Sequence, residues 1–330
     1  MKLVTFQRKN HPEQKYRLGA LLGEDAVLDL QAAAVFFLRE EGKTKDPLGK
    51  AVQLIPDDIC AFLERGGESL DLAGKAIAFS DSCRKRTGKP SQSDAGEDLL
   101  LPLASVSLKA PIPRPGKLIA MGLNFYDHAA ENKVPPPEMP VGFLKAATSL
   151  TGPGAPVPYP RSTKQLDYEI EMAIVIGKRG KDIPKERAFE FVAGYTILND
   201  LSARDIQSAE MKKRLVLLSK SLDGLGPLGP TLVTKDEVPD PDNLTMELFV
   251  NDEPEPRQKS NTRQMVFKVA DLVAYWSQMT LEPGDIISSG TPGGVAIFRQ
   301  PPEKWLLKPG DVVEARIEKL GVLRNRIVAE

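Results

Sequence analysis

The chain of 330 residues is 41% hydrophobic and 27% charged, which is typical of a folded globular protein and excludes a disordered or fibrous one. Its 44 basic and 45 acidic residues nearly cancel, so we expect a small-molecule partner and neither nucleic acid nor a membrane. No apolar run is long enough to span a membrane, and the N-terminal pattern is not that of a signal peptide, so a cytoplasmic location is expected. Cys60 and Cys83 have no metal-ligand spacing and are expected to be buried, reduced thiols.

The first hundred residues alternate short strand patterns with helical patterns and group no reactive side chains. Strands are predicted at 2–6, 18–22 and 27–30, and helices at 31–41 and 57–65. Two stretches rich in glycine, serine or proline, 88–97 and 110–116, indicate connecting structure. We therefore predict a small mixed α and β domain over residues 1–112 and a β-rich catalytic domain over residues 113–330.

The second domain opens with a strand pattern at 117–122, and the segment after it carries His128, one of two histidines in the chain. Asp127 is expected to cap a short helical turn there, which puts His128 and Glu131 on one face. A carboxylate that holds one imidazole nitrogen makes the ring a good general base near neutral pH. An ordinary exposed helix shows the same spacing, so both interpretations stay open.

Carboxylates alternate along residues 166–177, where the rest of the segment is largely apolar. As a strand, the segment places Asp167, Glu169 and Glu171 on one face. Such carboxylates repel one another unless they face water or hold a cation, and a hard divalent ion prefers oxygen ligands of this kind. The pattern therefore indicates either a metal site or a solvated strand face.

Later segments place single polar residues at the ends of apolar patterns. Asp200 follows the strand pattern at 191–198, where ligands commonly bind, although an Asx turn or a helix cap explains it equally well. Lys220 lies at the start of a loop rich in glycine and proline, which either brings its ammonium to a bound anion or is an ordinary surface turn. The strand pattern at 285–289 runs into glycines around Thr291, whose hydroxyl is suited to a carboxylate. The remaining elements of this half are predicted strands at 244–250 and 311–317 and a helix at 269–278.

Taken together in chain order, these motifs resemble the fumarylacetoacetate hydrolase family over residues 114–330. The segments that carry the resemblance are 122–131, 167–171, 199–207, 220–230 and 290–294. The resemblance implies an α+β protein with a rolled, mixed β-sheet catalytic domain beside the smaller N-terminal domain. It also implies a homodimer that binds Mg²⁺ or Mn²⁺ through acidic side chains.

The resemblance assigns site roles residue by residue. They are Glu169, Glu171 and Asp200 as metal ligands, His128 with Glu131 as the pair that activates water, Lys220 as a cation facing the substrate, and Gln207, Thr291 and Lys145 as substrate contacts. One branch of the family has a fourth metal carboxylate upstream of the histidine. Residues 122–126 offer none, so three ligands are expected here.

The activity that this resemblance implies is metal-dependent hydrolysis of a carbon–carbon bond in an acylpyruvate-like 1,3-diketo acid. The same site can stabilise an enolate formed in other ways, so an oxaloacetate-type decarboxylase and a hydroxymuconate-type isomerase are alternatives. A member of the fold that binds a ligand without turning it over is a third alternative.

Overall fold

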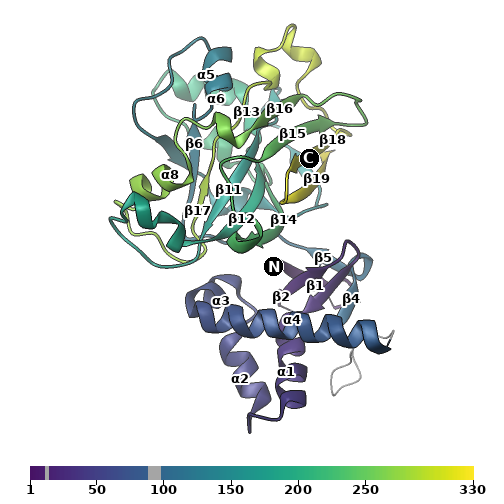
Figure 1. The fold of residues 1–330 in the computed structure, drawn as a ribbon. Helices are drawn as coiled ribbons and strands as arrows, with labels where there is room; N and C mark the ends of the chain where they lie inside the picture. Colours follow the sequence, from purple (N-terminus) through teal and green to yellow (C-terminus); the bar gives the residue numbers. More distant parts are fainter. Residues whose placement is uncertain (12–14, 88–97) are drawn as a thin grey trace.

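The computed structural model describes residues 1–11, 15–87 and 98–330 of the chain. Figure 1 shows the N-terminal helices gathered at one end of the molecule and the strands of the second half at the other, with the N-terminus at the junction. The predicted connection at 88–97 lies outside the described residues. The α+β class predicted from the sequence is confirmed.

A twelve-stranded mixed sheet runs through both halves of the chain. Its main path is β4 (Leu100–Pro102), β3 (Ala26–Asp29), β2 (Arg17–Leu22), β1 (Lys2–Arg8), β14 (Gly226–Thr234), β12 (Val192–Asn199), β11 (Ile170–Ile176), β17 (Ile286–Ser288), β6 (Leu118–Gly122) and β7 (Val141–Leu144). Off this path, β5 (Val106–Leu108) pairs with β1, and β8 (Leu150–Thr151) pairs with β14. The two halves meet where β1 pairs antiparallel with β14, with Leu3 opposite Leu232.

Two smaller sheets complete the second half. The five-stranded sheet has the order β16 (Gln258–Asn261), β15 (Thr245–Val250), β18 (Val312–Ile317), β19 (Gly321–Ala329) and β9 (Val157–Tyr159). The pair of β10 (Leu166–Asp167) and β13 (Ser202–Ala203) forms the other. The predicted strands at 244–250, 285–289 and 311–317 are thus confirmed, with bounds shifted by one residue where they differ.

Local sequence explains where the helices begin and end. α1 (Leu30–Glu41) follows Asp29, whose carboxylate accepts a hydrogen bond from the N–H of Ala32, and it ends at Gly42, whose φ of 67° is left-handed. The other helices are α2 (Pro47–Leu54), α3 (Ile59–Arg65), α4 (Gly67–Thr87), α5 (Tyr126–Glu131), α6 (Arg204–Met211), α7 (Leu218–Ser221) and α8 (Val269–Trp276). The sequence did not predict α2 or α4. Of the helices in the described ranges, none has the length and apolar character needed to cross a membrane.

β11 is buried on both faces and separates two hydrophobic cores. Met172 and Ile174 pack into the core of the second half, whereas Ala173 and Val175 pack into the core that the N-terminal helices supply. The N-terminal residues therefore extend the central sheet and also cover one of its faces. Hydrogen bonds and apolar contacts join the two parts. The division of the chain into two domains at residue 112 stays a prediction.

Candidate metal and active site

A break in one predicted strand gathers three carboxylates. Residues 166–177 form two strands, since β10 ends at Asp167 and β11 begins at Ile170. Between them, the N–H of Glu169 donates to Asn199 Oδ1 at 3.0 Å, and the N–H of Asp200 donates to the carbonyl of Glu169 at 2.8 Å. These bonds hold the end of β12 against the break, so that Asp200 lies beside Glu169.

The three carboxylates form one cluster. Glu169, Glu171 and Asp200 each offer an oxygen within 4.8 Å of the others, and all three side chains are buried. A solvated strand face does not fit such burial. Asp200 does not cap α6, because this helix begins after Ala203 and the Asp200 carboxylate is paired with Lys145 and Lys220. The structure therefore brings together the three residues that the sequence analysis names as metal ligands.

Asp167 does not share the face expected for it. Its carboxylate accepts hydrogen bonds from Arg204 Nε at 2.8 Å and from the N–H groups of Ala296 and Ile297 at 2.9 and 3.1 Å. The physical reason is the strand break after Asp167, which interrupts the alternation of side chains. Asp167 thus anchors another segment and is separate from the acidic cluster.

The electrostatics of the cluster fit a divalent cation. Burial and the nearby Asp200 and Glu169 raise the pKa of Glu171 well above its usual value. Neither Glu171 oxygen has a hydrogen bond of normal geometry within the described residues, although the Ser288 hydroxyl is near enough to lower that pKa slightly. A buried carboxylate without donors is unfavourable unless a positive charge lies against it. These oxygens are hard ligands of the kind that divalent ions such as Mg²⁺ and Mn²⁺ take.

Two buried lysines lie against the same cluster. Lys220 Nζ is 2.6 Å from Glu169 Oε2 and 2.8 Å from Asp200 Oδ2, so its side chain is not a solvated surface group. Lys145 Nζ is 3.0 Å from Asp200 Oδ1 and also donates to the carbonyl of Lys220. Burial alone would raise the pKa of Glu169, but the charges of Lys220 and Arg204 outweigh it and lower that pKa to about 2.

The predicted histidine and glutamate lie on one face of α5. His128 Nδ1 is 3.4 Å from Glu131 Oε2, and the imidazole is close enough to Glu169 for its charge to lower the pKa of that carboxyl. The expected cap is wrong, because α5 starts after Phe125 and Asp127 instead accepts hydrogen bonds from Ser260 Oγ and the N–H of Gly293. An imidazole therefore lies within electrostatic range of the acidic cluster.

The predicted substrate contacts all have partners within the chain. Gln207 Oε1 accepts a hydrogen bond from Arg204 at 2.8 Å. Thr291 Oγ1 donates to the carbonyl of Ile170 at 3.0 Å and accepts from Gln258 Nε2 at 2.9 Å. Their contact with a substrate, like that of Lys145, stays a prediction.

The sequence analysis gave no role to two residues that the structure places in the site. Arg204 binds Asp167 and also lies 2.7 Å from Glu169 Oε1, so it links two carboxylates. Asn132 Nδ2 lies 3.3 Å from His128 Nε2 and donates to the His128 carbonyl at 2.9 Å. The signal for Asn132 was its position four residues after His128, one helical turn away.

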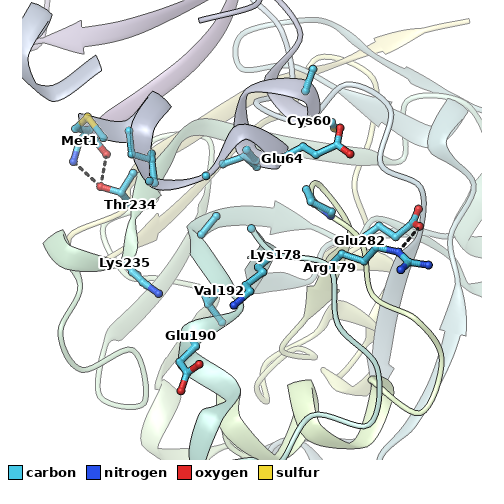
Figure 2. A pocket seen from close by; sticks show the side chains of 18 of the residues that line it. Met1, Cys60, Glu64, Lys178, Arg179, Glu190, Val192, Thr234, Lys235 and Glu282 are labelled. Atoms are coloured by element: carbon cyan, nitrogen blue, oxygen red, sulfur yellow. Dashed lines mark hydrogen bonds and ion pairs between the residues drawn. The ribbon is translucent and has the colours of Figure 1, made fainter. Parts of the chain in front are cut away.

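A cavity of about 1050 Å³ lies away from these residues, between α3 and the start of α4 on one side and the central sheet on the other (Figure 2). Its lining includes Cys60, Lys178 and Lys235, together with acidic side chains such as Glu64 and Glu190. Burial raises the pKa of Cys60 to about 11, so this thiol is a poor nucleophile at neutral pH. None of the predicted site residues lines this cavity.

Known proteins match along the whole chain. The family model described as fumarylacetoacetate (FAA) hydrolase C-terminal matches residues 117–328. Oxaloacetate tautomerase Fahd2a, mitochondrial, from Rattus norvegicus is 40% identical over 329 residues, covering 99% of this chain and 92% of the rat protein. The solved fumarylacetoacetate hydrolase from Exiguobacterium antarcticum is 32% identical with a TM-score of 0.75 and covers 100% of both chains. The maleylpyruvate hydrolase from Sphingobium sp. SYK-6, solved with manganese(II) and pyruvate, is 28% identical with a TM-score of 0.69 and covers 100% of this chain and 99% of its own.

Proposed function

The chain belongs to the fumarylacetoacetate hydrolase family, and on that premise we propose that it interconverts the enol and keto forms of a small 2-oxo diacid such as oxaloacetate, using a bound divalent cation. The observation that carries this proposal is the buried cluster of Glu169, Glu171 and Asp200 beside the pair of His128 and Glu131. The similarity to a rat oxaloacetate tautomerase over almost the whole chain supports the choice of substrate. This reaction differs from the carbon–carbon hydrolysis that the sequence resemblance implied.

Mg²⁺ or Mn²⁺ is the proposed cofactor, held by the three carboxylates of the cluster. When bound, the ion would supply positive charge that favours the enolate form of a 2-oxo acid. Both Glu171 oxygens lack a hydrogen bond of normal geometry within the described residues, so this carboxylate would be stabilised by that charge. Lys220 and Lys145, which already bind Asp200, would keep the cluster from carrying excess negative charge.

His128 is the proposed acid and base. Asn132 Nδ2 donates to the His128 carbonyl, which fixes the amide nitrogen on the side of the imidazole. Its second proton then favours a neutral ring with the lone pair on Nε2 and the proton on Nδ1, facing Glu131. In the keto-to-enol direction, the contact between Asn132 and Nε2 must open, after which C3 of the substrate loses a proton to Nε2 and the C2 oxygen gains one, so no water is consumed.

The rate at which the enol absorbance of oxaloacetate decays tests the proposal. We expect the enol to decay faster with the protein and Mg²⁺ or Mn²⁺ than with the metal ion alone, and a chelator to abolish this difference. The decay rate with H128A should be lower than with wild type by about 100-fold. His11, the other histidine, follows β1 in the N-terminal part, so H11A is the matched control and should match wild type. Equal rates of enol decay with and without chelator, or an unchanged rate in H128A, would contradict the proposal.

Hydrolysis of an acylpyruvate is the second candidate, because the same His128 and Glu131 pair can activate a water molecule. The similarity to a maleylpyruvate hydrolase over the whole chain favours it. NMR analysis of products from oxaloacetate and acetylpyruvate separates the candidates, since hydrolysis of acetylpyruvate yields acetate and pyruvate, and decarboxylation of oxaloacetate yields pyruvate and CO2. A rise in Tm with metal, but neither faster decay of the enol absorbance nor product from any substrate, would indicate the non-catalytic alternative.

The cytoplasmic location expected from the sequence remains a proposal. The rat relative carries the word mitochondrial in its name.

A further inference from the structure

The segment after Thr291 carries an aromatic side chain to the proposed base. Phe298, in the short 3₁₀ helix Ala296–Phe298, has its ring centroid 6.0 Å from that of His128, with the rings tilted by 58°. Ring pairs at this separation are in contact. Phe298 is nonetheless 40% exposed, so part of this residue is open to solvent.

Contacts on both sides of Phe298 hold this segment in place. Before it, the N–H groups of Ala296 and Ile297 donate to the buried carboxylate of Asp167. After it, the guanidinium of Arg299 stacks on Trp305 at 4.5 Å and donates to the carbonyl of Gly294 at 3.1 Å. The backbone on either side of Phe298 therefore cannot move away from α5 without breaking several hydrogen bonds.

The same contacts tie the segment to the chemical groups of the site. Asp167 is paired with Arg204, which also binds Glu169. The N–H of Gly294 donates to both oxygens of Glu131, at 3.0 and 3.1 Å. Phe298 is thus fixed relative to both the acidic cluster and the proposed base.

We propose that Phe298 is a specificity-determining residue that forms an apolar wall beside His128 and limits the group on C3 of a bound 2-oxo acid to about the size of a carboxylate. A substrate held at the cluster must reach His128 with its C3 atom, and a bulky C3 substituent would then meet the ring. This inference rests on the proposed function, since it names the substrate class of that same site. It predicts a preference for small 2-oxo acids over those with an aryl or long acyl group.

Calorimetric binding of pyruvate, 2-oxobutyrate and phenylpyruvate to the Mg²⁺-loaded protein tests the wall without requiring turnover. We expect F298A to lower the ratio of the phenylpyruvate Kd to the pyruvate Kd by about tenfold, as removal of a clash of this size does in other pockets. F298W should bind pyruvate as wild type does and bind 2-oxobutyrate more weakly, because the larger ring leaves less room beside C3. F189A is the matched control, because Phe189 is also 40% exposed but lies in the 3₁₀ helix Lys185–Glu190, and its ratio should equal that of wild type.

The proposal for Phe298 would be overturned if the ratio of the phenylpyruvate Kd to the pyruvate Kd in F298A stayed within twofold of wild type, or if F189A changed this ratio equally. Retained binding of pyruvate without turnover of oxaloacetate would overturn the proposed reaction and leave the wall in place. Failure of every variant and of wild type to bind any of the three acids would overturn both.

Discussion

Glu171 is the residue that links the stability of this protein most directly to its chemistry. Its side chain is fully buried, it faces two other carboxylates, and it has no hydrogen bond of normal geometry within the described ranges. A carboxyl whose pKa is higher in the folded than in the unfolded state stabilises the fold at low pH, and this stabilisation is lost as pH rises through the folded pKa. Metal binding would reverse that loss.

We therefore expect E171Q to unfold at a higher temperature than wild type when both are metal-free and the pH is 8, because the amide removes a buried charge. The difference should shrink as the pH falls, because burial and the neighbouring carboxylates raise the pKa of Glu171 in the folded protein. Mg²⁺ should raise the Tm of wild type but not of E171Q. Scanning calorimetry between pH 5 and 8 measures all three, and an equal metal-induced rise in both proteins would contradict a role for Glu171 as ligand.

Asn132 favours one tautomer of the His128 ring, the one with the proton on Nδ1 and the lone pair on Nε2. N132A should lower kcat about tenfold with little change in KM, because the ring loses the donor that selects its tautomer. N132D cannot donate to Nε2 and should favour a proton there, so the acid limb of the kcat/KM profile should move to higher pH. If Asn132 only capped α5, both variants would lower Tm and leave the pH profile unchanged.

At the scale of elements, the glycines after Thr291 bring a loop against α5. Gly294 has a φ of 103°, and a Cβ there would lie 2.5 Å from the carbonyl oxygen of Arg257. Its N–H is the group that binds Glu131. Gly310 has a φ of 102° but open space around it, so the two glycines share a backbone conformation that would strain an alanine and differ in their surroundings.

G310A should lower the free energy of unfolding by about 1 kcal/mol, the cost of a left-handed alanine. G294A should lower it by roughly 3 kcal/mol, because the same strain is joined by the steric clash. Only G294A should also reduce turnover, since the clash with the Arg257 carbonyl would move the N–H of residue 294 away from Glu131. Urea unfolding and the enol assay check both variants, and equal effects of the two substitutions would mean that the contact at Gly294 is unimportant.

The candidate site was more predictable from sequence than its supporting contacts. The acidic segments around Glu169, Glu171 and Asp200 stand out at the ends of apolar strands, and the family resemblance then singled out these three as ligands. The direction of the Asp167 side chain could not be predicted, because the break after β10 depends on the hydrogen bond from the N–H of Glu169 to Asn199, thirty residues further along the chain. Phe298 was missed for the same reason, because its contact with His128 joins segments far apart in the chain.

Elements were predicted where their patterns were local. α1 has a capping Asp29 and a terminal Gly42, and the structure places it within one residue of the predicted range. α4 is polar over most of its 21 residues, so its buried stripe gave little signal. The helix α7 was expected as loop, because its single turn lies next to a run of glycine and proline.

At the scale of the molecule, the N-terminal part and the second half share a sheet and a core. The longest N-terminal helices, α1 and α4, have 12 and 21 residues and would give much of the far-UV circular dichroism. Both tryptophans, Trp276 and Trp305, lie in the second half. The two spectroscopic signals therefore report on different parts of the chain.

We expect circular dichroism and tryptophan fluorescence to give the same midpoint in urea, because β1 pairs with β14 and the N-terminal core includes residues of β11. L3A, at the junction, should shift both midpoints together. Two separated midpoints would instead support independent domains divided near residue 112.

The homodimer implied by the family resemblance remains a prediction. Leu215 and Leu217 are 65% and 57% exposed, an unusual exposure for two leucines in one short segment. If this segment lies in the interface, light scattering should find a dimer for wild type and a monomer for the double variant L215E/L217E. Leu48 in α2 is 56% exposed, and L48E is the control that should stay dimeric.

The two faces of β11 pack against two different hydrophobic cores. A saturation mutagenesis library across residues 170–176, sorted once by abundance and once by turnover, should show an odd–even rhythm. Even-numbered positions would report on packing within the second half, and odd-numbered positions on its attachment to the N-terminal helices. Glu171 begins the odd-numbered series, so the face of the strand that fastens the two parts together also ends in the proposed catalytic centre.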